Sequence, residues 1–221
     1  MGEMIQLKAA DGFTFSAYVA GPASATKGVV VVQEIFGVNH HIREVADRFA
    51  ALGYAVVAPG LFDRASPGVE LGYTQADVDQ GRELRMKLSD ADVMKDIEAA
   101  ANHLSGKTLG IVGYCFGGTV AWWGATRTTK FAASSCWYGG GIPGTKDEQA
   151  NCPVQMHFGE KDASIPMTDV DAVRAAQPKA EVFVYEGAQH GFGCDERGSY
   201  SAPDYELAQQ RTVDFFAKNL G

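Results

Sequence analysis

Short apolar segments alternate with longer amphipathic segments along almost the whole chain, and this alternation constrains the fold more than any other feature. The apolar segments are GVVVVQ (28–33), AVVAP (55–59), LGIVG (109–113), FAASSCWYG (131–139), VQMHFG (154–159) and VFVYEG (182–187). Most are apolar throughout, as expected for strands of a sheet that is covered on both faces. The amphipathic segments predict helices at 40–53, 90–104, 119–126, 168–177 and 202–220, with Asn39, Thr168 and Ser201 at three N-cap positions.

This alternation predicts an α/β fold, in which a mostly parallel sheet carries helices on both faces. The segments MIQLKA and FTFSAYVA are joined through Asp11-Gly12 and predict an antiparallel hairpin at one edge of the sheet. With 221 residues, 46% of them hydrophobic, the chain suits one domain over residues 1–221. Loop-rich segments at 60–75, 139–153 and 187–201 follow the ends of predicted strands, where open α/β sheets place their ligands.

A cysteine in the segment GYCFGG (113–118) stands between a predicted strand and a predicted helix. A nucleophile on such a strand-to-helix turn needs small neighbours, which Gly113, Gly117 and Gly118 supply. The positive end of the following helix would favour a thiolate at Cys115, and the amide of Phe116 could bind an oxyanion. The alternative is a buried cysteine that only fills space, since cysteine is among the most buried residue types.

A nucleophile, an acid and a histidine are expected in this chain order, each on a loop after a strand. Asp162 follows the segment VQMHFG, and His190 follows VFVYEG, so both lie where this order predicts. Glu160 is a competing acid that stands closer to the strand end. We interpret the other four histidines as structural: His40, His41, His103 and His157.

A charged residue, Glu34, ends the apolar segment in VVVQEIFGVN. Its position predicts a buried carboxylate, which needs a hydrogen-bond donor or a proton, and the Cys115 thiol could supply one. The alternative is a solvated loop residue. The amide of Ile35 would be the second oxyanion donor, because α/β proteins with a serine nucleophile at such a turn often carry an oxyanion loop at this point.

Composition excludes several classes of function. The net charge of −8 makes nucleic acid an improbable partner, because phosphate binding needs clustered lysine and arginine. Four separated cysteines without a C-x-x-C pair argue against a zinc cage, and a site built on His190 and Cys194 would have too few ligands. The sequence shows no secretory signal and no membrane-length apolar segment, so we expect a reducing, cytoplasmic setting. GYCFGG does not have the spacing of a nucleotide-binding loop.

Five segments, QEIFGVN, GYAVVAPGLFDR, GIVGYCFGG, FGEKDASIP and EGAQHGF, together resemble the dienelactone hydrolase family, or carboxymethylenebutenolidases. The resemblance covers nearly the whole chain and implies an α/β-hydrolase fold with a Cys-His-Asp triad of Cys115, His190 and Asp162. It also implies that Glu34 pairs with the resting thiol. In the mechanism that the resemblance implies, an anionic lactone disturbs that pair so that the glutamate takes the thiol proton. The thiolate then attacks the lactone carbonyl, the ring opens, and water hydrolyses the resulting thioester.

The family's carboxylate site matches less well. Arg82 corresponds to one of its arginines, and the alternative for Arg82 is a solvated helix residue. Cys194 occupies the nearest equivalent of the second arginine, and Arg197 follows later. Met86 stands where a tyrosine is usual, and Tyr138 remains as an aromatic wall.

The sequence therefore predicts a cofactor-free hydrolase of small lactones or activated esters, with conversion of dienelactone to maleylacetate as the best single reaction. The alternative is a general carboxylesterase or thioesterase.

Overall fold

The computed structural model describes residues 2–221, which form an α/β fold around an eight-stranded, mostly parallel sheet. The strands are β1 (Glu3–Lys8), β2 (Thr14–Ala20), β3 (Lys27–Val32), β4 (Ala55–Pro59), β5 (Thr108–Tyr114), β6 (Ala133–Trp137), β7 (Val154–Gly159) and β8 (Glu181–Tyr185). Their order in the sheet is β1-β2-β4-β3-β5-β6-β7-β8. The helices are α1 (His40–Ala51), α2 (Gln75–Met86), α3 (Asp90–His103), α4 (Phe116–Arg127), α5 (Met167–Ala176) and α6 (Ala202–Asn219), with 3-10 turns η1 (Leu61–Arg64) and η2 (Pro143–Thr145).

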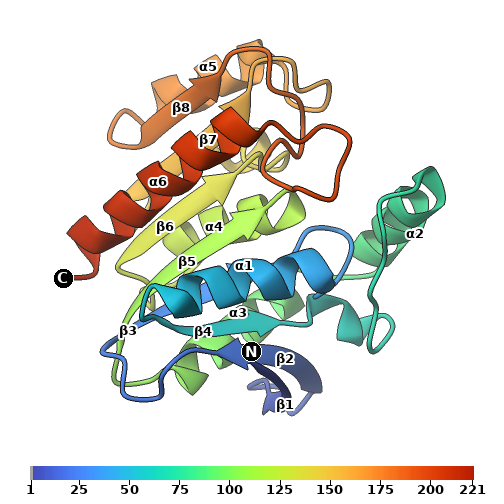
Figure 1. The fold of residues 1–221 in the computed structure, drawn as a ribbon, viewed down its shortest axis with the longest axis vertical. Helices are drawn as coiled ribbons and strands as arrows, with labels where there is room; N and C mark the ends of the chain where they lie inside the picture. Colours follow the sequence, from blue (N-terminus) through green and yellow to red (C-terminus); the bar gives the residue numbers. More distant parts are fainter. Residues whose placement is uncertain (1) are drawn as a thin grey trace. The chain divides into compact units, whose positions relative to one another are not determined.

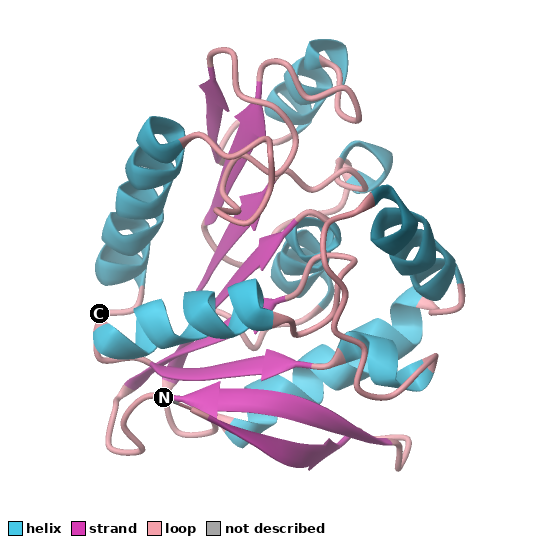
Figure 2. Ribbon diagram, turned by 45° about the vertical axis from the view of Figure 1, so that its right-hand side comes forward, coloured by secondary structure: helices cyan, strands magenta, loops and turns pink. Residues whose placement is uncertain are grey.

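The chain divides into two compact units, the first ending at Ile111 and the second beginning at Val112. In the first unit, β1 and β2 form the expected antiparallel hairpin, β2 is antiparallel to β4, and β3 is parallel to β4. All five residues of β4 and five of six in β3 are buried, because α1 covers one face of these strands and α3 covers the other (Figures 1 and 2).

A charged cluster fastens the hairpin of the first unit to α3. The Arg64 guanidinium donates to both carboxylate oxygens of Asp96, each at 2.8 Å, and its Nη1 lies 3.1 Å from the Asp11 carboxylate in the hairpin turn. The Asp96 side chain is fully buried, so its charge depends on this two-pronged contact.

In the second unit, β6, β7 and β8 are parallel, with Cys136 opposite Met156 and His157 opposite Phe183. Helix α6 lies on one face of these strands, and α4 and α5 lie on the other (Figures 1 and 2). All residues of β6 and β7 are buried, as expected for strands covered on both faces. Among residues 2–221, no helix combines the length and the apolar character that a bilayer crossing needs.

The structure confirms the fold class and corrects two details. Helix α5 begins at Met167 with Pro166 at its N-cap, so the assignment of Thr168 as an N-cap is wrong. Helix α2 lies outside the predicted helices, and only Gly81 and Leu84 of its residues are buried. A Thr74–Asp77 capping box starts α2, so local hydrogen bonds support a helix that has little apolar pattern. One domain for the whole chain stays a prediction.

Candidate active site

Cys115 occupies a sharp turn between β5 and α4, with φ 55° and ψ −114°. This left-handed backbone is unfavourable for a residue with a Cβ atom, and such strain is typical of functional sites. The amide of Cys115 donates to the carbonyl of Trp137 at the end of β6, at 3.0 Å. A Cβ atom on Gly113 would collide with the carbonyl of Gly117, so this glycine is required for the turn to close. The turn therefore has the geometry of a nucleophile elbow.

Helix α4 starts directly at the elbow. Phe116 is its first residue, so its amide belongs to the first turn, at the positive end of the helix dipole. A Cβ atom on Gly118 would collide with the carbonyl of Trp137, so glycine at this position lets α4 approach β6 closely. Cys115 is itself the N-cap residue of α4, at the end of the helix where negative charge is stabilised.

Three side chains of the second unit meet at the ends of its strands. The Nε2 atom of His190 lies 3.1 Å from the Sγ atom of Cys115, and its Nδ1 atom lies 2.7 Å from Oδ2 of Asp162. The other oxygen of Asp162 accepts the amide of Ser164 at 2.8 Å. The Asp162 side chain is fully buried, whereas that of His190 keeps 19% of its surface exposed. The predicted nucleophile, base and acid are thus hydrogen-bonded in series.

The environment favours a charged imidazole. Burial alone would lower the pKa of His190, but the charge of the Cys115 thiolate and the hydrogen bonds with Asp162 and Cys115 outweigh it and raise this pKa above its ordinary value. The contact between Sγ of Cys115 and Nε2 of His190 is short enough for a proton to pass between the two atoms. Both ring nitrogens are occupied by these partners, which leaves neither for a metal shared with Cys194.

Glu160, the competing acid, has a different partner. Its Oε2 atom accepts the amide of Gly187 at 3.0 Å, and this bond together with Lys161 lowers its pKa. The Glu160 carboxylate therefore stabilises the turn that leads from β8 to His190, while Asp162 orients the imidazole.

Three further residues surround His190. The ring of Tyr138 is fully buried and makes an edge contact with the imidazole of His190, with the two ring centroids 5.2 Å apart. The Arg197 guanidinium lies against Gly191, where an added Cβ would come within 2.5 Å of Nη1. The hydroxyl of Ser199 donates to the carbonyl of His190 at 2.7 Å. Sequence reasoning missed Ser199, because a serine in a polar loop carries no local signal of its partner.

The remaining predicted residues lie in the first unit. Glu34 follows β3 and is buried, with about 1% of its surface exposed, as its position in the sequence predicts. The Gln33 side chain donates to the carbonyl of Glu34 at 3.1 Å. Helix α2 packs against Ile35, the residue after Glu34, since a Cβ on Gly81 would collide with the carbonyl of Ile35. The exposed Arg82 thus projects from a helix seated on the loop that carries Glu34 and Ile35. The roles of Glu34, Ile35 and Arg82 stay predictions.

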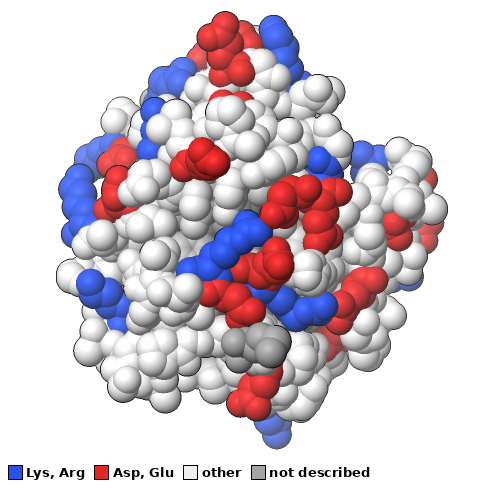
Figure 3. All heavy atoms as spheres, in the orientation of Figure 1, with Lys and Arg blue, Asp and Glu red and all other residues white. Residues whose placement is uncertain are grey.

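Charged side chains of both signs are mixed on the face of the molecule that Figure 3 shows, and red and blue atoms alternate over short distances. With 27 acidic and 19 basic residues, the acidic groups are in excess.

Known proteins share both sequence and fold with this chain. The model of the dienelactone hydrolase family matches residues 15–220. A Pseudomonas putida protein named carboxymethylenebutenolidase is 34% identical over 230 residues, covering 97% of this chain and 96% of its own. A Synechocystis protein provisionally given the same name is 37% identical, covering 92% and 91% of the two chains. The crystal structure of a Klebsiella pneumoniae protein, provisionally described as a dienelactone hydrolase, has a TM-score of 0.82 at 33% identity and covers 98% and 99%.

Proposed function

Because the chain belongs to the dienelactone hydrolase family and is a hydrolase that acts on esters, we propose that it opens lactones or activated esters by nucleophilic attack of Cys115. The observation that carries this proposal is the continuous chain of contacts from Sγ of Cys115 to His190 at 3.1 Å and from His190 to Asp162 at 2.7 Å. An imidazole held between a thiol and a buried carboxylate is suited to move a proton in both directions.

The proposed reaction has two halves. In the first, the Cys115 thiolate attacks the carbonyl carbon, and the oxyanion is bound by the amides of Phe116 and Ile35. The carbon–oxygen bond of the ester breaks, the imidazolium of His190 gives its Nε2 proton to the leaving oxygen, and a thioester remains. In the second half, Nε2 removes a proton from water, the hydroxide attacks the thioester, and the thiolate leaves with the proton retained on His190. Asp162 stabilises the charged imidazole in both halves.

Glu34 is proposed to pair with the protonated thiol of Cys115 in the resting enzyme and to take its proton only when an anionic substrate disturbs that pair. The thiolate would then form only with substrate present, which limits its oxidation. Glu34→Gln should then lower turnover of anionic lactones while the triad stays intact. The measurement is the rate of Cys115 alkylation by iodoacetamide against pH, for wild type and Glu34→Gln, with and without a non-saturating anionic substrate analogue. A wild-type rate that does not respond to the analogue would exclude this role for Glu34.

The best single substrate is dienelactone, hydrolysed to maleylacetate, because its carboxylate suits an arginine site. The proximity of Arg197 to the backbone beside His190 supports a part in binding that carboxylate, with Arg82 as the second candidate. Tyr138 is proposed as an aromatic wall of the substrate site, which it bounds by holding the ring of His190 in place. A general carboxylesterase or thioesterase is the second candidate, favoured by Met86 on α2, which has 76% of its surface exposed and replaces the family's usual tyrosine.

The proposed setting follows from the chemistry. A thiolate nucleophile is best preserved in a reducing compartment, so we place the protein in the cytoplasm. Its partner is a small, anionic lactone or ester, and the proposed reaction uses neither a cofactor nor a metal. Nucleic acid and membrane surfaces are not among the proposed partners.

A comparison of two substrates tests the specificity. Loss of dienelactone is followed beside hydrolysis of a neutral p-nitrophenyl ester, for wild type and Arg197→Ala. An anion-specific lactonase should show a rise in KM for dienelactone in Arg197→Ala, with little change for the neutral ester. Equal effects on the two substrates, or a wild-type preference for the neutral ester, would favour the general esterase.

A second experiment tests the nucleophile. Cys115→Ala should lower kcat by about 10⁴-fold or more, because the covalent route is removed. Iodoacetamide should inactivate the wild type through a single adduct at Cys115. Cys152 is the matched control, since burial raises the pKa of its thiol to about 11 and keeps it protonated near neutral pH. Normal turnover in Cys115→Ala would disprove the mechanism.

A further inference from the structure

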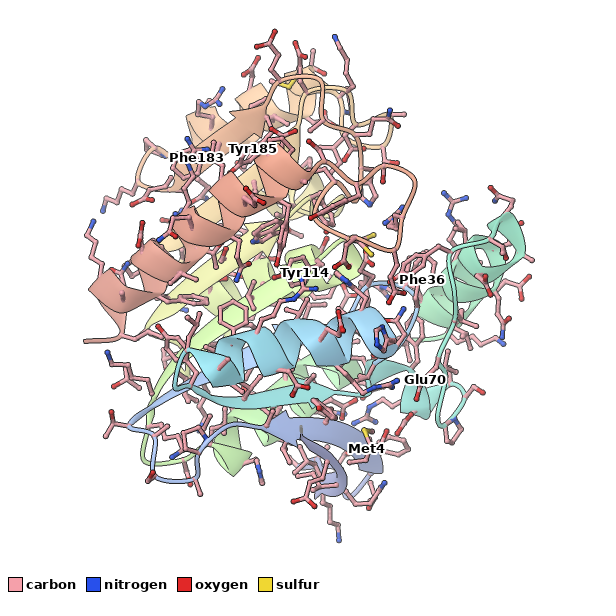
Figure 4. All side chains as sticks on the ribbon, in the orientation of Figure 1. Met4, Phe36, Glu70, Tyr114, Phe183 and Tyr185 are labelled. Carbon is pink, nitrogen blue, oxygen red and sulfur yellow. The ribbon has the colours of Figure 1, made fainter. Side chains whose placement is uncertain are left out.

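A chain of buried polar side chains lies beneath the triad in the second unit, on the side of β7 and β8 that α6 covers. His157 of β7 is fully buried, and its Nδ1 atom lies 2.8 Å from the hydroxyl of Tyr185 at the end of β8. Its Nε2 atom lies 2.9 Å from Oε1 of Gln155 and 3.2 Å from the hydroxyl of Thr212 on α6. Figure 4 labels Phe183 and Tyr185 on β8, beside α6.

The partners of Gln155 determine which nitrogen of His157 carries the proton. The Gln155 amide nitrogen donates to the Glu181 carboxylate at 3.0 Å and to the Arg211 carbonyl at 3.4 Å. Its oxygen therefore faces His157 and can only accept, so Nε2 of His157 must be the donor. Burial and the nearby Arg211 lower the pKa of His157 to about 3, which makes the ring neutral. A neutral ring protonated at Nε2 has an acceptor at Nδ1.

Tyr185 determines the direction of the remaining hydrogen bonds in this series. Burial raises the pKa of Tyr185, so its hydroxyl keeps its proton and donates to Nδ1 of His157. The same oxygen accepts from Nη1 of Arg211 at 3.2 Å, and the Arg211 guanidinium lies 4.1 Å from the ring centroid of Phe183. The hydrogen bonds thus run in one direction, from Arg211 through Tyr185 and His157 to Gln155. Every group in this series is satisfied in only one arrangement.

One branch of this network leads to the base. The carbonyl of Tyr185 accepts the amides of Glu160 at 2.9 Å and Ala188 at 3.3 Å, so it joins the segment that carries Asp162 to the turn that carries His190. The Tyr185 ring also packs on Phe192, two residues after His190, with centroids 4.9 Å apart. The hydroxyl bond to His157 fixes the ring on which the His190 loop rests.

The other branch leads to the nucleophile. The indole nitrogen of Trp137 donates to the hydroxyl of Thr212 at 3.2 Å, and the same hydroxyl contacts Ser135 at 3.0 Å. The carbonyl of Trp137 accepts the amide of Cys115, so the position of Trp137 helps to set the elbow. Its ring lies 4.8 Å from that of His157. Both branches therefore start from one cluster and end at different members of the triad.

We propose that His157, through Tyr185 and the Thr212–Trp137 pair, is a positioning residue that sets the distance between Cys115 and His190. This rests on the proposed function, because it assigns the cluster a task only if the Cys115–His190 pair performs the chemistry. A small displacement of either member weakens the ion pair, which lowers the thiolate fraction and slows the covalent step. Substrate binding, which depends on other residues, is left unchanged.

The test compares variants that each remove one buried hydroxyl. Tyr185→Phe cuts the branch to His190, and Thr212→Val cuts the branch to Cys115. Ser134→Ala is the matched control, because Ser134 is equally buried on β6 but donates to the carbonyl of Ala121 in α4, at 2.8 Å. For each protein, circular dichroism and the melting temperature establish folding. Next, kcat and KM are measured with one ester, and the rate of Cys115 alkylation is measured against pH.

Tyr185→Phe and Thr212→Val should lower kcat by roughly 10- to 100-fold with KM little changed, since displacements below 1 Å have effects of this size. Their alkylation profiles should move to higher pH, while Ser134→Ala keeps the wild-type profile. Wild-type kcat and alkylation in both variants, or the same losses in Ser134→Ala, would overturn the positioning role. Activity in Cys115→Ala would instead overturn the proposed function, so the two failures are distinguishable.

Discussion

At the level of single residues, Asp162 and Glu160 stand two positions apart but bind different partners. Asp162 contacts the ring of His190 at 2.7 Å, whereas Glu160 accepts a backbone amide from Gly187. Asp162→Asn should lower kcat by roughly 10²- to 10⁴-fold, because the amide cannot stabilise the imidazolium. Glu160→Gln should leave kcat near the wild-type value, because its neutral side chain can still accept the Gly187 amide.

Asp162→Asn should also move the pH profile of kcat/KM. The hydrogen bond that Nδ1 of His190 donates to Asp162 helps to raise the pKa of His190. Wild type should therefore keep the imidazolium at pH values well above the ordinary histidine pKa of 6.5, and the alkaline limb of kcat/KM should lie there as well. Loss of the carboxylate charge should shift this limb to lower pH. A harmless Asp162→Asn combined with a damaging Glu160→Gln would reverse the assignment of the acid.

At the level of elements, the close approach of β5, β6 and α4 depends on glycine. Gly113→Ala places a methyl group against the backbone of Gly117, and neither the strand nor the helix can move without displacing Cys115. We expect a loss of about 2–4 kcal/mol in the free energy of unfolding, or failure to fold, because the overlap involves backbone atoms.

Gly144→Ala is the control for this substitution, because no atom lies within 4 Å of the added methyl group. Denaturant unfolding of the two variants provides the measurement. Similar stability for both would mean that the elbow tolerates a side chain at position 113.

Strands and buried helices could be predicted from the sequence because their apolar residues repeat with a fixed period. Helix α2 could not, since only Gly81 and Leu84 are buried and local capping replaces the apolar pattern. The meeting of Cys115, His190 and Asp162 could be predicted because each of them occupies a fixed place after a strand. The cluster around His157 could not, because its bonds join Tyr185 and Thr212 to residues 28 and 55 positions away and depend on how β7, β8 and α6 pack.

At the level of the whole molecule, one buried histidine and one partly buried histidine make stability depend on pH in opposite directions. The pKa of His157 falls from 6.5 to about 3 on folding, so its contribution is fully present above pH 6.5 and declines as the pH falls toward 3. The pKa of His190 is raised, so its contribution is fully present below pH 6.5 and is lost as the pH rises through the folded-state value. These two groups together favour maximal stability near pH 6.5.

His157→Gln should therefore flatten the acid side of the stability curve. Wild type should lose up to about 1.4 kcal/mol per pH unit from this group below pH 6.5. The variant should be less stable at pH 7, because it breaks the bond to Tyr185, but its stability should fall less steeply toward pH 4. Urea unfolding at several pH values measures both curves, and parallel curves would contradict a neutral, buried His157.

The left-handed backbone of Cys115 has an evolutionary consequence. Such a conformation costs on the order of 1–3 kcal/mol, a large part of a net stability of roughly 5–15 kcal/mol. Glycine adopts it without penalty, so Cys115→Gly should melt at a higher temperature than Cys115→Ala, although both lack the thiol. Selection for turnover thus holds this position away from its most stable residue. A descendant released from catalysis would be expected to drift toward glycine here, and such a glycine in a related sequence would mark a pseudoenzyme.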